Sequence, residues 1–434
     1  MHDAEAKPPS PQANAPSLTG TQKRTLAVLL VSQIFSGVGL AAGVTVGALL
    51  VQDMLRSTAL AGLPSALLTA GSAVAAVSIG RISHALGRRP GLAAGYLAGA
   101  LGGAGVVAAA SLDLPALLVI SLVLYGAGTA ANLQARYAGA DLAAARNRAR
   151  AVSTVLVATT LGGVVGPNLA APAGHLATAL GLPPLTGLFL VSGAAFAVAA
   201  LILIVWLRPD PLVLARSLAD EPEDAPRVGS GAVPEDSKHA ERRHPGLWLG
   251  VLVMVLGQLV MVAIMTMTPV HMQDHGHSAA ASGLVIALHV GAMYLPSPLA
   301  GTLSDRCGPK RVVIASGLVL LAAGVIAAAS PDDSVVLLAV ALVLLGVGWN
   351  FGLVSGTTIL TNAVPVTTRA KTQGVVDVAV AVAGATGGMA SGVVVAAASY
   401  PLLALTGAAL ALVVPAAIAI SARRALPGDR AGRP

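Results

Sequence analysis

Two short stretches decide how this chain is built. They read Gly301-Thr-Leu-Ser-Asp-Arg-Cys-Gly-Pro-Lys-Arg311 and Gly80-Arg-Ile-Ser-His-Ala-Leu-Gly-Arg-Arg-Pro90. Each lies between two long apolar runs and combines glycine with several basic residues. Such a stretch is typical of a tight turn between two helices on the cytoplasmic side of a membrane. Its recurrence roughly half a chain apart indicates an internal repeat.

The composition around these stretches is that of a membrane protein. Of the 434 residues, 55% are hydrophobic and 10% are charged, whereas a soluble domain carries about 25% charged residues. The apolar residues come in runs of about 20, long enough to cross roughly 30 Å of hydrocarbon as a helix. The alternating pattern of a membrane β-barrel is absent. We therefore predict an all-α polytopic membrane protein.

The apolar runs number twelve and fall into two groups of six. The predicted organisation is a disordered tail over 1–24, a six-helix bundle over 25–207, a flexible linker over 208–246, a second bundle over 247–421 and a tail over 422–434. The spans are 25–51, 61–83, 91–110, 115–137, 151–172, 186–207, 247–270, 281–303, 311–329, 334–363, 371–398 and 400–421.

The basic residues set the orientation. With the N-terminus inside, the predicted outer loops hold only Arg56 of the 26 lysines and arginines. Inner loops are enriched in these residues, so both termini are expected in the cytoplasm. The net charge of +7 then reflects orientation, and no nucleic-acid partner is expected. The sequence contains no phosphate-binding loop ending in Gly-Lys-Ser/Thr and no soluble catalytic set, so we do not expect an enzyme.

The second inner loop resembles the signature of the major facilitator superfamily, Gly-x-x-x-Asp-Arg-x-Gly followed by basic residues. The matching residues there are Gly301, Asp305, Arg306, Gly308 and Arg311. In the first loop the matching residues are Gly80, Arg88 and Arg89, but His84 stands where the acid is expected. The resemblance implies twelve helices in two bundles, alternating access, and inner loops that latch one conformation. His84 is either an ordinary polar loop residue or a source of pH dependence.

Two apolar spans carry soft-metal side chains at one-turn spacing. Met261 and Met265 lie in the seventh span, and His289 and Met293 lie in the eighth. Residues four apart share one helix face, and thioether and imidazole groups are Cu(I) ligands without formal charge. By helix rise, Met261 and His289 lie at matching depth near the midplane. Ordinary packing of methionine and a satisfied histidine is the alternative.

This arrangement is similar to the CcoA-like bacterial copper importers, which carry Met-x-x-x-Met on helix 7 and His-x-x-x-Met on helix 8. The resemblance implies import of copper, as Cu(I), across the bacterial cytoplasmic membrane through Met261, Met265, His289 and Met293. Copper is then the transported substrate and no resident cofactor is expected. The expected partners are membrane lipid and a cytoplasmic copper chaperone, with the transporter itself a monomer.

The segment between these two spans is rich in histidine and is predicted to lie outside. His271, Met272, His275 and His277 could collect copper on arrival, although a solvated polar loop explains the same residues. A further candidate is Asp377 in span 11. It either pairs with Lys371 or Arg369, or it faces the pathway and takes up protons.

Two other functions stay open. Span 5 contains Gly162-Gly-Val-Val-Gly166-Pro167, which resembles part of a motif of proton-coupled drug exporters. This glycine spacing also serves plain helix packing. The alternative to copper import is therefore a proton-coupled exporter of small organic compounds. A sensor with this fold that transports nothing is the third possibility.

Overall fold

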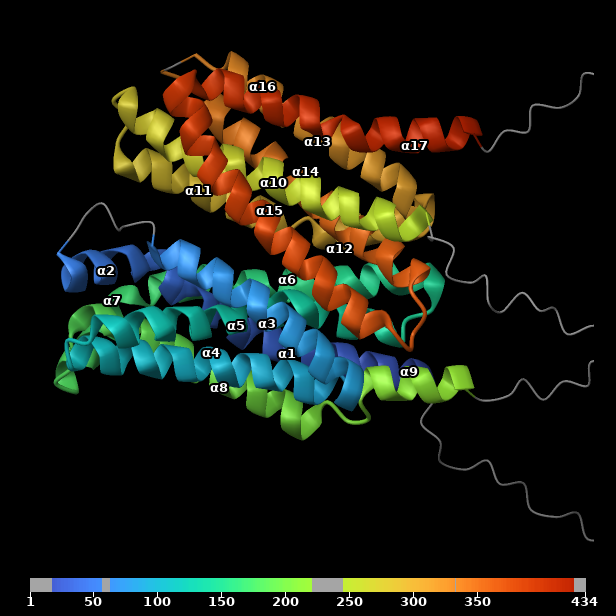
Figure 1. Ribbon diagram of the computed structural model, residues 1–434, viewed down its shortest axis with the longest axis horizontal. Coiled ribbons are helices and arrows are strands. Elements are labelled where there is room, and N and C mark those ends of the chain that lie inside the picture. Colours follow the sequence, from blue (N-terminus) through green and yellow to red (C-terminus); the bar gives the residue numbers. More distant parts are fainter. Residues whose placement is uncertain (1–17, 57–62, 221–244, 332, 425–434) are drawn as a thin grey trace, which may run out of the picture.

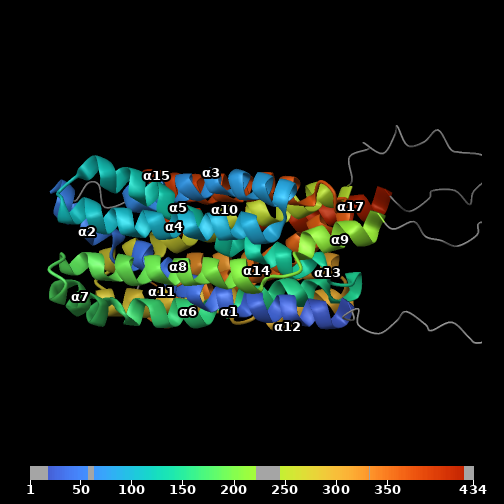
Figure 2. The same ribbon diagram turned by 90° about the horizontal axis from the view of Figure 1, so that it is seen from below.

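The computed structural model describes residues 18–56, 63–220, 245–331 and 333–424. Helices account for nearly all of these residues, and no strand occurs among them. The chain forms two helical bundles, one stacked on the other with their long axes side by side (Figure 1). The view turned by 90° shows the main helices running along the same long axis (Figure 2). The all-α fold predicted from the apolar runs is confirmed.

The first bundle contains the helices from α1 to α8. Their bounds are α1 Leu18–Thr45, α2 Gly47–Leu55, α3 Leu63–Leu86, α4 Arg88–Ser111, α5 Pro115–Asp141, η2 Ala145–Asn147, α6 Arg148–Asn168, α7 Ala170–Ala179, η3 Pro184–Thr186 and α8 Gly187–Trp206. Its core joins apolar side chains with a stack of buried aromatic rings, Tyr96, Tyr125, Phe189 and Phe196.

The second bundle contains the helices from α10 to α17. Their bounds are α10 Pro245–Asp274, α11 Ala279–Tyr294, α12 Ser297–Cys307, α13 Pro309–Ala329, α14 Val335–Ala363, α15 Arg369–Ala397, α16 Tyr400–Ala411 and α17 Val413–Arg424. Helix α14 lies at the centre and packs against α10, α11 and α13. Helix α10 also packs against α15, and its contact with α11 is slight.

Eleven helical segments of the described residues are long and apolar enough to cross a membrane. The predicted span 151–172 is not among them. It corresponds to α6 and the start of α7, and its polar residues Ser153, Thr154, Thr159 and Thr160 lower its hydropathy. Helix α6 nevertheless packs along α1 inside the bundle. It therefore takes the place predicted for the fifth membrane helix.

Two predicted boundaries are wrong. Residues 18–24 belong to helix α1, although the tail was expected to extend to residue 24. The predicted linker also begins with a helix, α9 Pro211–Asp220. Helix α9 buries Pro211 and Leu212 against the ends of α4 and α5. The proline and charge content of the segment predicted a flexible linker. A ten-residue amphipathic helix contains too few apolar residues to be recognised within such a composition. Residues 221–244 lie outside the described residues.

Candidate functional site

The two bundles are joined at the ends of the helices predicted to face the cytoplasm. Helix α3 of the first bundle packs along α15 of the second, and α6 of the first packs along α12 of the second. Figure 1 shows α15 descending across the second bundle onto the first at the end of the molecule where α9 lies. We call this region the inner gate; it is closed in this structure.

Glycine lets the helices of the inner gate approach closely. A Cβ atom on Gly301 would lie 2.8 Å from the carbonyl oxygen of Ala149 in α6. A Cβ atom on Gly80 would lie 3.0 Å from the carbonyl oxygen of Ala370 in α15. The two loops therefore place their first glycine against the first turn of a helix in the opposite bundle. The internal repeat predicted from the sequence is visible as two equivalent contacts.

Asp305 continues the second of these contacts. Its two carboxylate oxygens accept hydrogen bonds from the backbone N–H groups of Ala149 and Arg150, each at 3.0 Å. These N–H groups lie in the first turn of α6 and have no partner within the helix. A carboxylate is also stabilised by the positive end of the helix dipole. Asp305 thus caps a helix of the other bundle, and its role as a conformational latch stays a prediction.

The other matching residues of the second loop serve the turn itself. Gly308 has φ of 90°, a conformation that residues with a side chain rarely adopt. Arg306 is exposed, and the Arg311 guanidinium donates to the carbonyl oxygen of Cys307 at 3.3 Å. Among the described residues neither arginine forms a hydrogen bond or ion pair with the opposite bundle.

His84, at the position equivalent to Asp305, is bound by the linker helix. Arg216 of α9 donates to the carbonyl oxygen of His84 at 2.7 Å and lies 3.3 Å from its Nδ1 atom. The same guanidinium donates to the carbonyl oxygen of Thr367 in the second bundle at 3.1 Å. An arginine can only donate, so Nδ1 of His84 accepts here. Arg216 therefore bridges the two bundles where the motif acid is missing.

Asp210 anchors α9 at this position. Its carboxylate accepts a hydrogen bond from the backbone N–H of Arg89 at 2.7 Å, at the start of α4. It also accepts from the N–H of Leu212 at 3.0 Å, at the start of α9. One carboxylate thus caps two helices. Arg89 joins the gate through its backbone, whereas the motif suggested a role for its side chain.

Arg88 is fully buried and belongs to a charged cluster in the gate. Its Nε atom lies 2.8 Å from Asp141, and its guanidinium also donates to Gln373 of the second bundle. Arg369 of the second bundle lies 3.6 Å from Asp141. Arg88 thus joins the bundles, as the motif predicts for a latch residue.

A second buried ion pair joins the bundles closer to the membrane centre. Arg136 of α5 donates to Asp377 of α15 at 2.7 Å and to Thr357 of α14 at 3.1 Å. The hydroxyl of Tyr137 donates to the same Asp377 oxygen at 2.9 Å. The prediction that Asp377 pairs with Lys371 or Arg369 is wrong, because helix rotation turns it toward α5 of the other bundle.

The four predicted copper ligands lie in the second bundle. His289 is fully buried, Met261 and Met293 are nearly so, and Met265 is half-buried. The Nδ1 atom of His289 lies 2.7 Å from the carbonyl oxygen of Leu342 in α14. Its Nε2 atom is buried without a hydrogen-bond partner. Helix α14 packs against both α10 and α11, and the contact between α10 and α11 themselves is slight.

The histidines predicted to collect copper are not gathered into a metal site. No group of three or more His, Cys, Asp or Glu side chains suited to a metal occurs among the described residues. His271 stacks on Tyr400 with ring centroids 4.3 Å apart, and its ring is also 4.3 Å from that of His275. Met272 is fully buried, and His277 follows the turn that ends α10. Their proposed role in copper capture stays a prediction.

Two polar residues of α5 and a glycine of α6 hold neighbouring helices of the first bundle together. Asn132 donates to Ser36 at 2.9 Å, and Gln134 donates to the carbonyl oxygen of Ala76 at 2.9 Å, both inside the first bundle. Gly162 packs on α1, where a Cβ atom would lie 2.0 Å from the carbonyl oxygen of Ile34. The glycine motif of span 5 is therefore used for helix packing at this residue.

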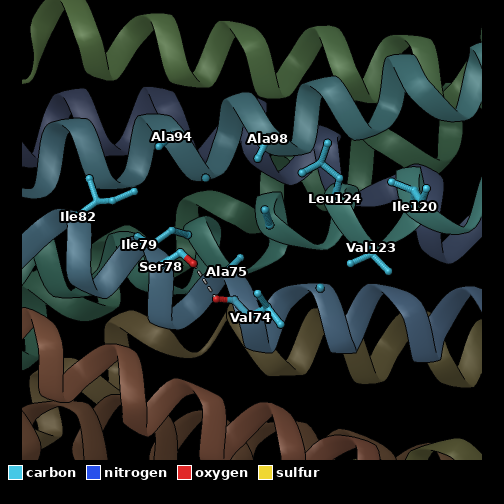
Figure 3. A pocket seen from close by; sticks show the side chains of 13 residues that line it. Val74, Ala75, Ser78, Ile79, Ile82, Ala94, Ala98, Ile120, Val123 and Leu124 are labelled. Atoms are coloured by element: carbon cyan, nitrogen blue, oxygen red, sulfur yellow. Dashed lines mark hydrogen bonds between the residues drawn. The ribbon is translucent and has the colours of Figure 1, made fainter. Parts of the chain in front are cut away.

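The side chains of α3, α4 and α5 form an apolar groove of about 400 Å³. Figure 3 shows the residues that line it, which are almost all apolar. The only hydroxyl among them, that of Ser78, donates to the carbonyl oxygen of Val74 at 3.1 Å. Val74 and Ile120 are largely exposed. A groove with these side chains can hold a lipid chain, and it offers no ligand for a cation.

Several gate residues were not among the candidates selected from the sequence. They are Arg136, Tyr137, Asp141 and Arg216. A signal was present for the first three, because charged and hydroxyl groups near the end of a long apolar run are rare and need partners. No local signal could identify those partners, which lie more than two hundred residues away for Arg136.

Known proteins are similar to this chain in both sequence and fold. The family model of the Major Facilitator Superfamily matches residues 26–296 and 272–434. The MFS-type transporter YddS of Bacillus subtilis is 53% identical over 392 residues, covering 90% of this chain and 89% of that protein. The riboflavin transporter RfnT of Brucella anthropi is 31% identical over 82% of this chain and 85% of its own length.

A solved structure agrees at the level of the fold. The proton:xylose symporter XylE superposes with a TM-score of 0.70 over 94% of this chain and 96% of that chain, at 15% sequence identity. These matches span nearly the whole sequence, including both inner loops. The chain therefore belongs to the Major Facilitator Superfamily, whose members are membrane transporters.

Proposed function

We propose that this transporter imports copper, as Cu(I), across the cytoplasmic membrane by alternating access. The observation that carries the proposal is the state of His289. A carbonyl oxygen can only accept, so the Nδ1 atom donates its proton to Leu342 and the Nε2 atom keeps its lone pair. That lone pair is buried and unpartnered. A ring held by a carbonyl at one nitrogen and free at the other is the usual form of a metal-binding histidine.

Methionines also lie on α10 and α11, two helices that pack against α14. Met293 lies one turn from His289 on α11, and its carbonyl oxygen accepts a hydrogen bond from Asn350 of α14 at 2.7 Å. Met261 and Met265 lie one turn apart on α10, which also packs against α14. Neutral nitrogen and sulfur ligands favour a soft monovalent ion and hold it without a fixed counter-charge. Such a site is better suited to transport of the ion than to its permanent retention.

Uptake by proteoliposomes tests the proposal. Wild-type protein, His289→Ala and Met261→Ala are reconstituted at equal density and given radioactive Cu(I). Loss of one ligand should lower initial uptake by about tenfold, since each ligand contributes roughly 1.4 kcal/mol or more to cargo binding. Met267→Ala is the matched control, because Met267 is a half-buried methionine of the same helix off the Met261–Met265 face. Uptake by both ligand variants equal to that of the control would refute His289 and Met261 as the copper site.

A planar organic cargo is the second candidate. The Trp349 ring nitrogen donates to Gln258 at 2.8 Å, and Tyr294 meets the Trp349 ring edge-on with centroids 5.8 Å apart. Two aromatic rings beside an oriented amide suit a flat molecule with polar edges. The similarity to a riboflavin transporter supports this alternative. Riboflavin uptake by the same vesicles, lost in Trp349→Ala and intact in His289→Ala, would favour it over copper.

A further inference from the structure

We infer that the groove between α3, α4 and α5 binds one anionic phospholipid of the inner membrane leaflet, with an acyl chain in the groove and the phosphate at Arg81. The groove lies on a different side of α3 from Gly80, which meets α15 at the inner gate. The proposed cargo ligands lie in the other bundle. The inference therefore does not depend on which cargo is carried.

The groove is made by small side chains on helices that cross the membrane. Ala75, Ala94 and Ala98 are among the residues that line it, and they leave a volume of about 400 Å³ (Figure 3). Val74 and Ile120 also line it and are 68% and 64% exposed. Because α3, α4 and α5 are all long and apolar enough to span a bilayer, this exposed apolar surface lies at the depth of the lipid tails.

The length of the groove matches one leaflet. Along α3 it extends from Gly71 to Ile82, which is about 16 Å at a rise of 1.5 Å per residue. Half of a hydrocarbon layer of roughly 30 Å is about 15 Å. Ile82 lies one turn before Leu86, the end of α3 predicted to face the cytoplasm, whereas Gly71 lies two turns after the start at Leu63. The groove is therefore displaced toward the inner leaflet.

Arg81 places a positive charge beside the inner end of the groove. Val74, Ser78 and Arg81 follow one another at intervals of four and three residues, so they share one side of α3. Val74 and Ser78 line the groove. Arg81 is exposed, and among the described residues it forms no hydrogen bond or ion pair. A guanidinium group binds phosphate oxygens through two parallel charge-assisted hydrogen bonds, so Arg81 is suited to a phosphate at this depth.

The charges around Arg81 favour a lipid with a net negative headgroup. None of the residues that line the groove is charged, and the hydroxyl of Ser78 is bonded within its own helix. Arg216, the cation next along this end of α3, already donates to His84 and Thr367. A zwitterionic headgroup carries an amine that these two cations repel. The cytoplasmic leaflet is also the one that attracts basic residues through its anionic lipids.

A second copy of this chain fits the groove less well. Two copies in one membrane have the same orientation, so a symmetric contact through this face brings the same residues together at equal depth. Arg81 would then lie near the Arg81 of the other copy without a counter-charge. A phospholipid supplies that counter-charge and fills the apolar groove with the same molecule.

Native mass spectrometry of the full chain in mild detergent tests the inference. Phosphatidylglycerol and phosphatidylcholine with identical acyl chains are titrated separately. We expect one phosphatidylglycerol to bind about tenfold more tightly than phosphatidylcholine, the difference that one charge-assisted hydrogen bond provides. Excess inorganic phosphate should leave the lipid bound, because the acyl chain holds it in the groove. Equal binding of the two lipids, displacement by phosphate, or a dimer in place of the lipid adduct would overturn the inference.

Variants assign the two parts of the site. Arg81→Gln should lose the preference for phosphatidylglycerol, and Arg81→Lys should keep most of it. Arg146→Gln is the matched control, since Arg146 is an exposed arginine at the inner end of the same bundle. Ala98→Phe fills the groove and should weaken both lipids about tenfold, whereas Leu97→Phe, at an exposed position outside the groove, should not. An unchanged preference in Arg81→Gln would refute the phosphate position even if Ala98→Phe failed to fold.

Discussion

The two inner loops have the same backbone arrangement and different polar chemistry. Gly301 and Gly80 make equivalent close contacts with α6 and α15. Four residues later, Asp305 caps α6 directly, whereas His84 is held by Arg216 of the linker helix, which reaches the segment before α15. The comparison teaches that close helix packing is the shared requirement. The hydrogen bonds that hold the two bundles together beside this packing can come from the loop itself or from another part of the chain.

Removing the direct cap should have the largest effect. In Asp305→Ala, the N–H groups of Ala149 and Arg150 lose a partly buried carboxylate at a helix start. Such a cap contributes up to about 2 kcal/mol, so the closed population of the gate should fall by roughly thirtyfold. The distance between spin labels attached at positions 146 and 310, which are exposed residues near the gate in opposite bundles, measures this population. An unchanged distance distribution would show that Asp305 is not a latch.

Restoring the missing acid should act in the opposite direction. In His84→Asp, the carboxylate lies at the position equivalent to Asp305 and can accept from the N–H groups that start α15. We expect about 1 kcal/mol in favour of the closed gate, which is roughly a fivefold shift, and slower transport because the gate must open in every cycle. His84→Asn is the control, since its neutral amide interacts less with the helix dipole. Equal closed populations in the two variants would refute the equivalence of the two loops.

Loss of the linker bridge should have the smallest effect. Arg216→Ala removes partly exposed hydrogen bonds to His84 and Thr367, and exposed charged contacts contribute about 0.5 kcal/mol. The closed population should fall about twofold. Arg208→Ala, which changes an exposed arginine just before α9, is the control. A fall as large as that of Asp305→Ala would mean that α9 is the main latch.

Much of the fold could be predicted because it depends on local patterns. Apolar runs of helical length and the recurring glycine-containing loops indicated the two bundles and the internal repeat, whereas the orientation in the membrane stays a prediction. The cap formed by Asp305 follows the same motif, although its acceptor role toward α6 could not be seen in the sequence. The short helix α9 was not predicted because its few apolar residues are surrounded by charged residues and proline.

The candidate site was only partly predictable, because it depends on how each helix is rotated. His289 was selected from its rarity in an apolar run, yet only the fold shows that Leu342 holds one nitrogen and leaves the other free. The intervening position of α14 could not be deduced from the order of helices. The pairing of Arg136 with Asp377 joins residues far apart in the chain, and no spacing rule connects them.

The central claim is that His289 and its neighbouring thioethers hold the cargo. X-ray absorption spectroscopy of the purified chain loaded with one equivalent of Cu(I) tests it directly. We expect one nitrogen and two or three sulfur neighbours around the copper, with the nitrogen lost in His289→Ala and one sulfur lost in Met293→Ala. Copper that fails to bind, or a spectrum that is identical in the wild type and both variants, would contradict the account.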